Sequence, residues 1–370
     1  MRHAVLSLCT GLLFASSFTH AIDKPEQIAF RQGRKASEEG RFEEAIEQFQ
    51  KVLRESASFE PMWTRNNLGY ALFKLKRYEE AARVLEQALA LPSKSHEPKL
   101  YINAVSNYLA RDDKDRALGV CLTGVQRFPE QPWIWDNLGW IYSLQDNRAD
   151  AAKAYAEACR LVEKDQQPVG TKLALPFHGT WICKQGNGGA FSHLSLLARY
   201  AWDFEAVNDR KRSVNGEGKH NKDYAGFGKE ICAPLAGKVV ELNDGAKDND
   251  PGQRDPLTAR GNYVVLEHGP QEFTCFFHMQ RGSIAVKLGD QVQQGQRLGC
   301  CGNSGYSTEP HLHFALVNAK GTNGISRPVK FGPYTLVGKN TGASPTSNEI
   351  RPTKIDEGVP EAGELIENAR

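Results

Sequence analysis

The amino-acid sequence predicts a chain of two unlike parts, an all-α superhelix followed by a mostly antiparallel β-sheet domain. Three observations support this prediction. Helical segments recur along residues 29–161 at a nearly constant spacing, and glycine-rich turns with short β-type runs take over after Glu163. The length of 370 residues also exceeds what one ordinary hydrophobic core holds.

Residues 1–21 have the pattern of a cleavable secretory signal. A short basic start precedes an apolar run over residues 4–18, and the segment ends in the small residue Ala21. The run is short for a bilayer span, and no later segment approaches ~20 consecutive apolar residues. We therefore expect a secreted or periplasmic protein of the cell envelope, cleaved near Ala21 and without a transmembrane segment.

Composition and cysteine usage narrow the class of protein. The chain is 40% hydrophobic and 24% charged, as in soluble globular proteins, and its formal charge of +2 gives no support to a nucleic-acid partner. Of eight cysteines, Cys9 lies in the predicted signal, and the odd number that remains cannot all pair within one chain. Disulfides are permitted after export, but their connectivity cannot be read from the sequence. A cysteine-ligated structural zinc is disfavoured because no Cys-x-x-Cys pair occurs.

The N-terminal part is internally repetitive. The segment GRFEEAIEQF at 40–49 recurs as KRYEEAARVL at 76–85, with shorter echoes at 114–118 and 148–152. The recurring alanines are separated by 36, 36 and 34 residues: Ala45, Ala81, Ala117 and Ala151. This period is close to the ~34 residues of a tetratricopeptide unit, and residues 22–163 resemble a tetratricopeptide repeat domain of about four repeats.

The repeats predict a binding groove. They also contain Asn-Leu-Gly motifs at 67–69 and 137–139, which place leucine and glycine where paired helices approach closely. Stacked helix pairs leave a concave surface that suits an extended peptide, so the resemblance implies a protein partner. Aromatic side chains either line this groove or, as we favour, belong to the helical core. They are Trp63, Trp133, Trp135 and Trp140.

After the repeats we expect a linker over residues 164–175, a β-rich domain over 176–334 and a disordered tail over 335–370. Runs at 238–242, 263–267, 273–278 and 312–317 read as strands separated by turn residues. The tail is rich in Gly, Pro, Ser, Thr and Glu and has few large apolar residues.

Two imidazoles near residue 312 are the first sign of chemistry. His311 and His313 are two residues apart on a predicted strand and so share one of its faces. Taken alone, such a pair is more often two polar residues on a half-exposed strand than a metal site. Further histidines and an aspartate upstream in an exported chain favour zinc instead.

Several blocks from 200 onward resemble the lysostaphin-like (LytM-type) zinc metallopeptidases, which cut peptide bonds of bacterial peptidoglycan. Five blocks occur in the family's order and lead into 299–314: Tyr200–Phe204, Ile231–Val240, Gly261–Gly269, Phe276–Met279 and Ser283–Gln296. The resemblance implies a mostly antiparallel β fold and a Zn²⁺ cofactor. It also implies that Asp203 and His313 ligate the metal, while His278 and His311 act on the nucleophilic water and the oxyanion.

One position departs from the family pattern. The family usually carries a histidine four residues before the aspartate, where this chain has Arg199, and an always-protonated guanidinium is no ordinary zinc ligand. Divergent members carry a Ser-His ahead of a Tyr-Ala-x-Asp-Phe segment, which here points to His193 as the third ligand. The alternative for His193 is a plain surface residue on a glycine-rich loop. His178 and His220 are poorer candidates.

The sequence thus predicts a zinc metalloendopeptidase that hydrolyses peptide bonds of peptidoglycan, with tetratricopeptide repeats that recruit a protein partner. Two alternatives remain. Because Arg199 replaces a family ligand, the domain can be a catalytically degenerate regulator that activates other cell-wall hydrolases. The second alternative is a scaffold in which only the repeats matter.

Overall fold

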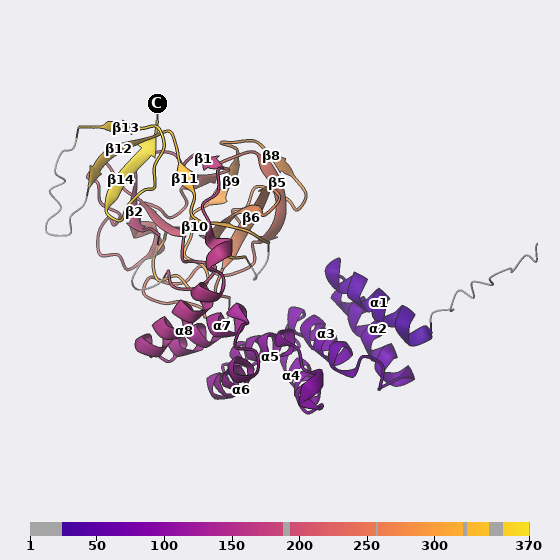
Figure 1. Ribbon diagram of the computed structural model, residues 1–370. Coiled ribbons are helices and arrows are strands. Elements are labelled where there is room, and N and C mark those ends of the chain that lie inside the picture. Colours follow the sequence, from indigo (N-terminus) through magenta and orange to yellow (C-terminus); the bar gives the residue numbers. More distant parts are fainter. Residues whose placement is uncertain (1–23, 188–192, 257, 321–323, 340–350, 370) are drawn as a thin grey trace, which may run out of the picture. The chain divides into compact units, whose positions relative to one another are not determined.

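The structure is a computed structural model, and Figure 1 shows its ribbon. It describes residues 24–187, 193–256, 258–320, 324–339 and 351–369. The predicted signal at 1–21 lies outside these ranges. The chain divides into two compact units, one ending at His96 and the other beginning at Glu97.

The first unit is built from two helix pairs whose apolar stripes face each other. In α2 the side chains of Ala45, Ile46, Phe49 and Val52 are buried, a spacing that places them on one side of a helix. The unit contains α1 (Pro25–Glu38), α2 (Phe42–Glu55), α3 (Pro61–Lys74), α4 (Tyr78–Leu89) and the short η1 (Ser93–Ser95).

The second unit begins with two further helix pairs and continues into the β domain. Its helices are α5 (Pro98–Ala110), α6 (Lys114–Arg127), α7 (Pro132–Leu144), α8 (Arg148–Leu161) and the short η2 (Glu163–Gln166). The described residues thus contain eight α-helices, which confirms the predicted helical repeat region. None of these helices is long and apolar enough to cross a membrane.

The repeat glycines lie where the helices of a pair touch. A Cβ built on Gly69 of α3 would lie 2.6 Å from Cγ of Leu85 on α4, and one on Gly139 of α7 would lie 2.7 Å from Cδ1 of Tyr155 on α8. Only a residue without a side chain permits this approach, as the sequence motif suggested.

A ten-stranded sheet dominates the β domain, in the order β13-β12-β14-β2-β3-β10-β7-β6-β5-β8, and every pairing within it is antiparallel. This confirms the predicted fold class, and the four strand runs identified in the sequence correspond to β5, β6, β7 and β10. The strands before the C-terminal segment are β2 (Trp181–Gln185), β3 (Trp202–Ala206), β5 (Gly237–Asn243), β6 (Asn262–Gly269), β7 (Glu272–Met279), β8 (Gln291–Val292) and β10 (Leu312–Val317).

Two small sheets and one short helix complete the domain. β1 (Lys172–Leu173) pairs in parallel with β11 (Lys330–Phe331), and β4 (Glu230–Cys232) pairs antiparallel with β9 (Arg297–Cys300). The helix η3 spans Asn221–Asp223. The predicted linker over 164–175 therefore contains part of η2 and all of β1.

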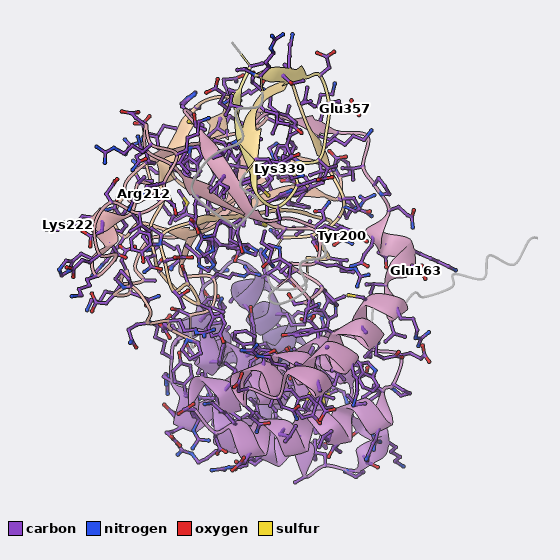
Figure 2. All side chains as sticks on the ribbon, turned by 90° about the vertical axis from the view of Figure 1, so that its left-hand side faces the viewer. Glu163, Tyr200, Arg212, Lys222, Lys339 and Glu357 are labelled. Atoms are coloured by element: carbon purple, nitrogen blue, oxygen red, sulfur yellow. The ribbon has the colours of Figure 1, made fainter. Side chains whose placement is uncertain are left out.

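The C-terminal segment differs from the disordered tail predicted for 335–370. It forms β12 (Tyr334–Lys339), β13 (Thr353–Ile355) and β14 (Glu364–Asn368), and β14 inserts between β12 and β2. Ion pairs join this segment to the domain: Glu357 lies 3.0 Å from Lys172 and 2.7 Å from Lys330. Glu357 and Lys339 are labelled in Figure 2. Composition misled the prediction because the few apolar residues of this segment are well placed: Leu365 and Ile366 are buried, and Leu336 and Ile355 pack against the core.

The large sheet has an apolar layer on each face. Strand alternation sends Trp202, Phe204, Leu312 and Phe314 into one cluster, and Phe277, Ala315 and Val317 into the other. Within the described residues the seven cysteines from Cys121 onward are buried and unpaired, so none forms a disulfide.

Replacement of Gly139 tests the packing of the last helix pair. We expect Gly139→Ala to lower the free energy of unfolding by about 1–3 kcal/mol, because the new methyl group overlaps the Tyr155 ring. Gly119→Ala on α6 is the matched control, since nothing lies within 4 Å of its added Cβ. It should raise stability by up to about 1 kcal/mol through helix propensity. Urea unfolding followed by circular dichroism measures both, and equal effects would contradict the close approach.

Truncation of Ile366 tests the C-terminal strand. Its side chain is fully buried, so Ile366→Ala should cost about 2–5 kcal/mol of unfolding free energy. Val359→Ala, at a side chain that is 39% exposed, should stay within about 0.5 kcal/mol of the wild type. A tail without structure would leave both variants as stable as the wild type in thermal unfolding.

Candidate metal centre

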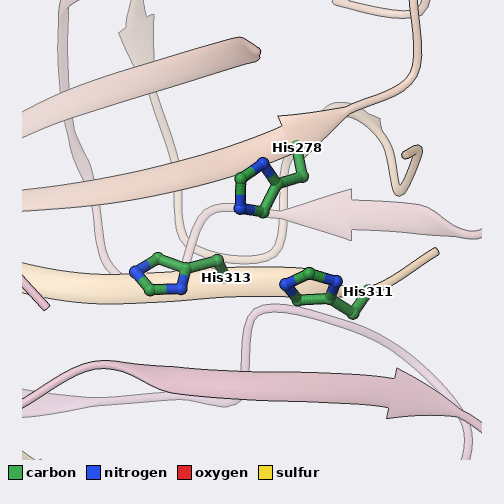
Figure 3. A group of neighbouring side chains, drawn as sticks. All are labelled: His278, His311 and His313. Carbon is green, nitrogen blue, oxygen red and sulfur yellow. The ribbon is translucent and has the colours of Figure 1, made fainter. Parts of the chain in front are cut away.

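The site lies where β3, β7 and β10 run side by side. Asp203 on β3 and His313 on β10 are direct cross-strand partners, and His313 also stands opposite Phe277 on β7. His278 follows Phe277 on β7, and His311 immediately precedes β10. Figure 3 shows the rings of His278, His311 and His313 facing one another across these two strands.

Strand alternation explains why polar groups gather here. Asp203 lies between two buried aromatic residues, Trp202 and Phe204, so its carboxylate points to the opposite face of the sheet. His313 lies between Leu312 and Phe314 and points to that same face. The sequence therefore places these two side chains next to each other as soon as the strands pair.

His193 reaches the same place from the segment that leads into β3. Its Nε2 lies 3.1 Å from Oδ2 of Asp203, while Nδ1 of His313 lies 2.8 Å from Oδ1 of that carboxylate. The rings of His193 and His313 are 5.0 Å apart between centroids. His193 is 1% exposed, so it is not the surface residue that the sequence left as the alternative.

The donor set of these three residues fits a metal ion. Nδ1–H of His193 donates to the carbonyl oxygen of Gly186 at 3.3 Å, which in the neutral ring leaves a lone pair on Nε2 facing the carboxylate. Two lone pairs at such a distance repel unless a proton or a metal ion lies between them. A proton can join only one pair of these bases, whereas a metal ion can bind His193, Asp203 and His313 together. Two imidazoles and one carboxylate form a common zinc ligand set that leaves one coordination position open.

His278 and His311 are held in defined tautomers by backbone carbonyls. Nδ1–H of His278 donates to the Ser304 oxygen at 2.8 Å, and Nδ1–H of His311 donates to the Glu309 oxygen at 2.8 Å. A carbonyl only accepts, so Nδ1 carries the proton and Nε2 keeps its lone pair in each neutral ring. Nε2 of His311 lies 3.5 Å from Oδ1 of Asp203, at the edge of the candidate metal position.

The pKa values of Asp203 and His278 are shifted by burial and by the histidines beside them. Burial by itself would raise the pKa of Asp203, but the imidazoles of His311 and His313 outweigh it and hold that pKa well below its usual range. Burial, together with the neighbouring His311 and His313, lowers the pKa of His278 well below its ordinary value. The surroundings of His278 thus disfavour the charged form of its ring.

His278 also adopts an unusual backbone conformation, with φ of 61°. This left-handed region is costly for a residue with a side chain and persists where the surroundings fix it. Here the backbone N–H of His278 donates to Arg260 and its carbonyl accepts from Gly302. These two hydrogen bonds fix the backbone conformation of His278, whose ring faces that of His311.

Other groups identified in the sequence lie outside the site. Arg199 interacts with the thiol of Cys159 on α8 rather than with the histidines. His178 and His220 are exposed. Among the described residues, the groups of His, Cys, Asp and Glu arranged to hold a metal ion are His278 with His311 and His313, and His193 with Asp203 and His313.

Sequence reasoning missed the groups that orient the rings. They include the carbonyls of Gly186, Ser304 and Glu309, and the Ser307 hydroxyl, 3.3 Å from Nδ1 of His311. Carbonyls occur at every residue and therefore leave no signal in a sequence.

Comparison with known proteins agrees with this geometry. The model of peptidase family M23 matches residues 220–324, and a tetratricopeptide repeat model matches residues 30–96. The chain therefore carries an M23 peptidase domain together with tetratricopeptide repeats, which confirms the family resemblance seen in the sequence. His278, His311 and His313 lie inside the matched range, whereas His193 and Asp203 precede it.

Three curated relatives match parts of the chain. The peptidoglycan DD-endopeptidase ShyA of Vibrio cholerae is 47% identical over 57 residues, 15% of this chain and 13% of its own length. An uncharacterised metalloprotease of Haemophilus influenzae is 37% identical over 145 residues, 38% of this chain and 27% of its own. Lysostaphin of Staphylococcus simulans is 31% identical over 139 residues, 36% of this chain and 26% of its own. The chain thus spans less than a third of each of these relatives.

Solved structures resemble the helical part at low similarity. The crystal structure of MamA aligns with 38% of this chain and 79% of its own chain, at 20% identity and a TM-score of 0.35. No functional argument rests on this similarity.

Zinc binding tests the three candidate ligands. We expect the purified protein to hold one zinc ion, and His193→Ala, Asp203→Ala and His313→Ala each to weaken zinc affinity at least about 100-fold, since each removes a donor from a three-donor set. His178→Ala, at an exposed histidine, should bind zinc as the wild type does. Competition with a chromophoric chelator gives the affinities. An unchanged affinity of His193→Ala would exclude that residue from the ligand set.

Proposed function

We propose that this protein is a zinc metalloendopeptidase that hydrolyses peptide bonds of bacterial peptidoglycan, with His193, Asp203 and His313 as metal ligands. The observation that supports it best is the convergence of these three groups with His278 and His311 on one face of an M23 domain. The matched relatives include proteins named as a peptidoglycan DD-endopeptidase and as lysostaphin, which supports peptidoglycan as the substrate class.

The donor set defines what the site can do. Zinc held there would polarise a scissile carbonyl and bring the pKa of a bound water near ~7. In their neutral forms, His278 and His311 carry the lone pair on Nε2, because Nδ1 of each ring donates to a backbone carbonyl. One of these imidazoles would accept a proton from the attacking water, and the other, when protonated, would donate a hydrogen bond to the developing oxyanion. These two tasks are shared between His278 and His311.

The whole chain fits this role in the cell envelope. We propose that the signal-like segment at 1–21 directs export to the periplasm or the outside of the cell, where peptidoglycan is accessible. The repeats, whose helix pairs have the architecture of peptide-binding arrays, would recruit a protein partner.

Digestion of purified peptidoglycan tests the activity. We expect the wild type to release soluble fragments, and a chelator to abolish the release. His278→Ala and His311→Ala should each slow digestion by about 100- to 10,000-fold, the usual contribution of a general acid or base, while keeping their zinc. Mass spectrometry of the products measures the rate and identifies the bond that is cut. His178→Ala serves as the control and should digest at the wild-type rate.

The same experiment separates the alternatives. Digestion that persists in the chelator would contradict a zinc mechanism. A protein without activity of its own that accelerates a second cell-wall hydrolase would establish the regulator instead. A His313→Ala variant that complements a deletion strain as well as the wild type does would favour the scaffold.

A further inference from the structure

The last helix pair touches the segment that carries the candidate ligand His193. Residues 193–201, which lead into β3, contain turns rather than helix or strand. Their internal backbone bonds are few, running from Ala198 and Arg199 to Ser195 and from Ala201 to Ala198. A short segment of this kind does not fix a ligand within the few tenths of an ångström that a metal site needs, unless other elements hold it.

Leu196 is one of the residues at which the backbone of that segment is held from outside; another is Tyr200, whose N–H donates to the Ser326 hydroxyl at 3.1 Å. The carboxylate Oδ1 of Asp136 on α7 accepts the Leu196 backbone N–H at 2.7 Å. On the other side, the Leu196 carbonyl accepts from both the N–H and the hydroxyl of Ser326, each at 2.8 Å. Both backbone groups of Leu196 therefore have partners outside the segment, three residues from His193.

Helix α8 adds apolar contacts to the same point. The Leu196 side chain is fully buried in a cluster with Ala158, Cys159 and Val162, against which Trp133 and Trp135 of α7 pack. The Cys159 thiol also donates to the Leu194 carbonyl at 3.7 Å. Trp133 and Trp135 thus pack against a cluster that combines residues of the last helix pair with Leu196 and Ile325 of the β domain.

The side of α7 that carries Asp136 also contacts the loop that leads to His311. Trp140 lies four residues after Asp136, and its ring meets that of Tyr306 edge to face at 4.7 Å between centroids. Tyr306 precedes Ser307, whose hydroxyl contacts His311. One helix face therefore contacts both segments that carry site histidines.

Burial destabilises the charged form of Asp136. Burial raises its pKa to about 7, and the bond from the Leu196 N–H only partly offsets this. A leucine of similar shape would pack there without that penalty. A carboxylate at this position is more readily explained by the bond it makes than by packing.

We propose that Asp136 is a positioning residue of the metal centre, because its hydrogen bond to Leu196 sets the segment that places His193 against Asp203. This inference rests on the proposed zinc function. The last helix pair is then part of the peptidase site as well as part of the repeat array.

Three variants of the full-length purified protein test it. Asp136→Leu keeps the approximate volume and removes the acceptor, Asp136→Asn keeps an acceptor oxygen, and Asp115→Leu makes the same change at an exposed position of α6. Zinc affinity is measured by chelator competition, hydrogen exchange follows peptides that cover 193–201, and thermal unfolding reports stability.

We expect Asp136→Leu to weaken zinc affinity about tenfold and to speed exchange of 193–201 by a similar factor. Asp136→Asn should stay within about threefold of the wild type in both, and Asp115→Leu should match it. If Asp136→Leu does not fold, Asp136→Ser, whose hydroxyl is too short to replace the bond, takes its place with the same expected result.

The outcomes are distinguishable. A folded Asp136→Leu that binds zinc as tightly as the wild type, even with a lowered melting temperature, would show a merely structural contact and overturn the inference alone. A zinc affinity of Asp136→Asn as low as that of Asp136→Leu would also overturn the inference. A wild type that takes up no zinc would overturn the proposed function, and this inference with it.

Discussion

The pairing of β3 with β10 is the interaction on which the site depends. It sets Asp203 directly across from His313, and alternation sends the residues on either side of them into the core. A slip of one residue would turn the flanking side chains Trp202, Phe204, Leu312 and Phe314 toward the face that holds the site, and would place the carboxylate and the imidazole in the larger apolar cluster. An ionised carboxylate moved into an apolar core without a partner costs several kcal/mol, a large part of the whole stability of a domain. The hydrophobic core therefore fixes the position of the two polar groups.

Electrostatics then limits what these groups can do. Several bases crowd around one carboxylate in a partly buried position, and their lone pairs repel unless a cation lies among them. The backbone carbonyls bonded to His193, His278 and His311 hold each Nδ1 as a donor and, in the neutral ring, leave the lone pair on each Nε2. Polar groups are thus oriented before any ligand arrives, which is the condition under which a site acts without reorganising.

The helices and the sheet of the second unit share a boundary rich in specific contacts. α7 and α8 contact the segment before β3 through a hydrogen bond and an apolar cluster. α7 also contacts the loop at Tyr306 through the aromatic pair of Trp140 and Tyr306. In a repeat array the exposed end of the last helix pair needs a cover. Here the β domain supplies it, so the apolar residues of that end serve the peptidase domain.

The sequence by itself determined the two-part architecture, because the repeat of Ala45, Ala81, Ala117 and Ala151 and the alternation of apolar residues around Asp203 and His313 are local patterns with direct structural meaning. It also pointed to the five site residues through family resemblance. Only the tertiary structure decided that His193 lies at the carboxylate while Arg199 turns toward α8, since both belong to a segment without periodic structure. The C-terminal strands were likewise decided by tertiary structure. β14 has only a short apolar pattern, and it forms because β2 and β12 offer it hydrogen-bonding partners on both sides.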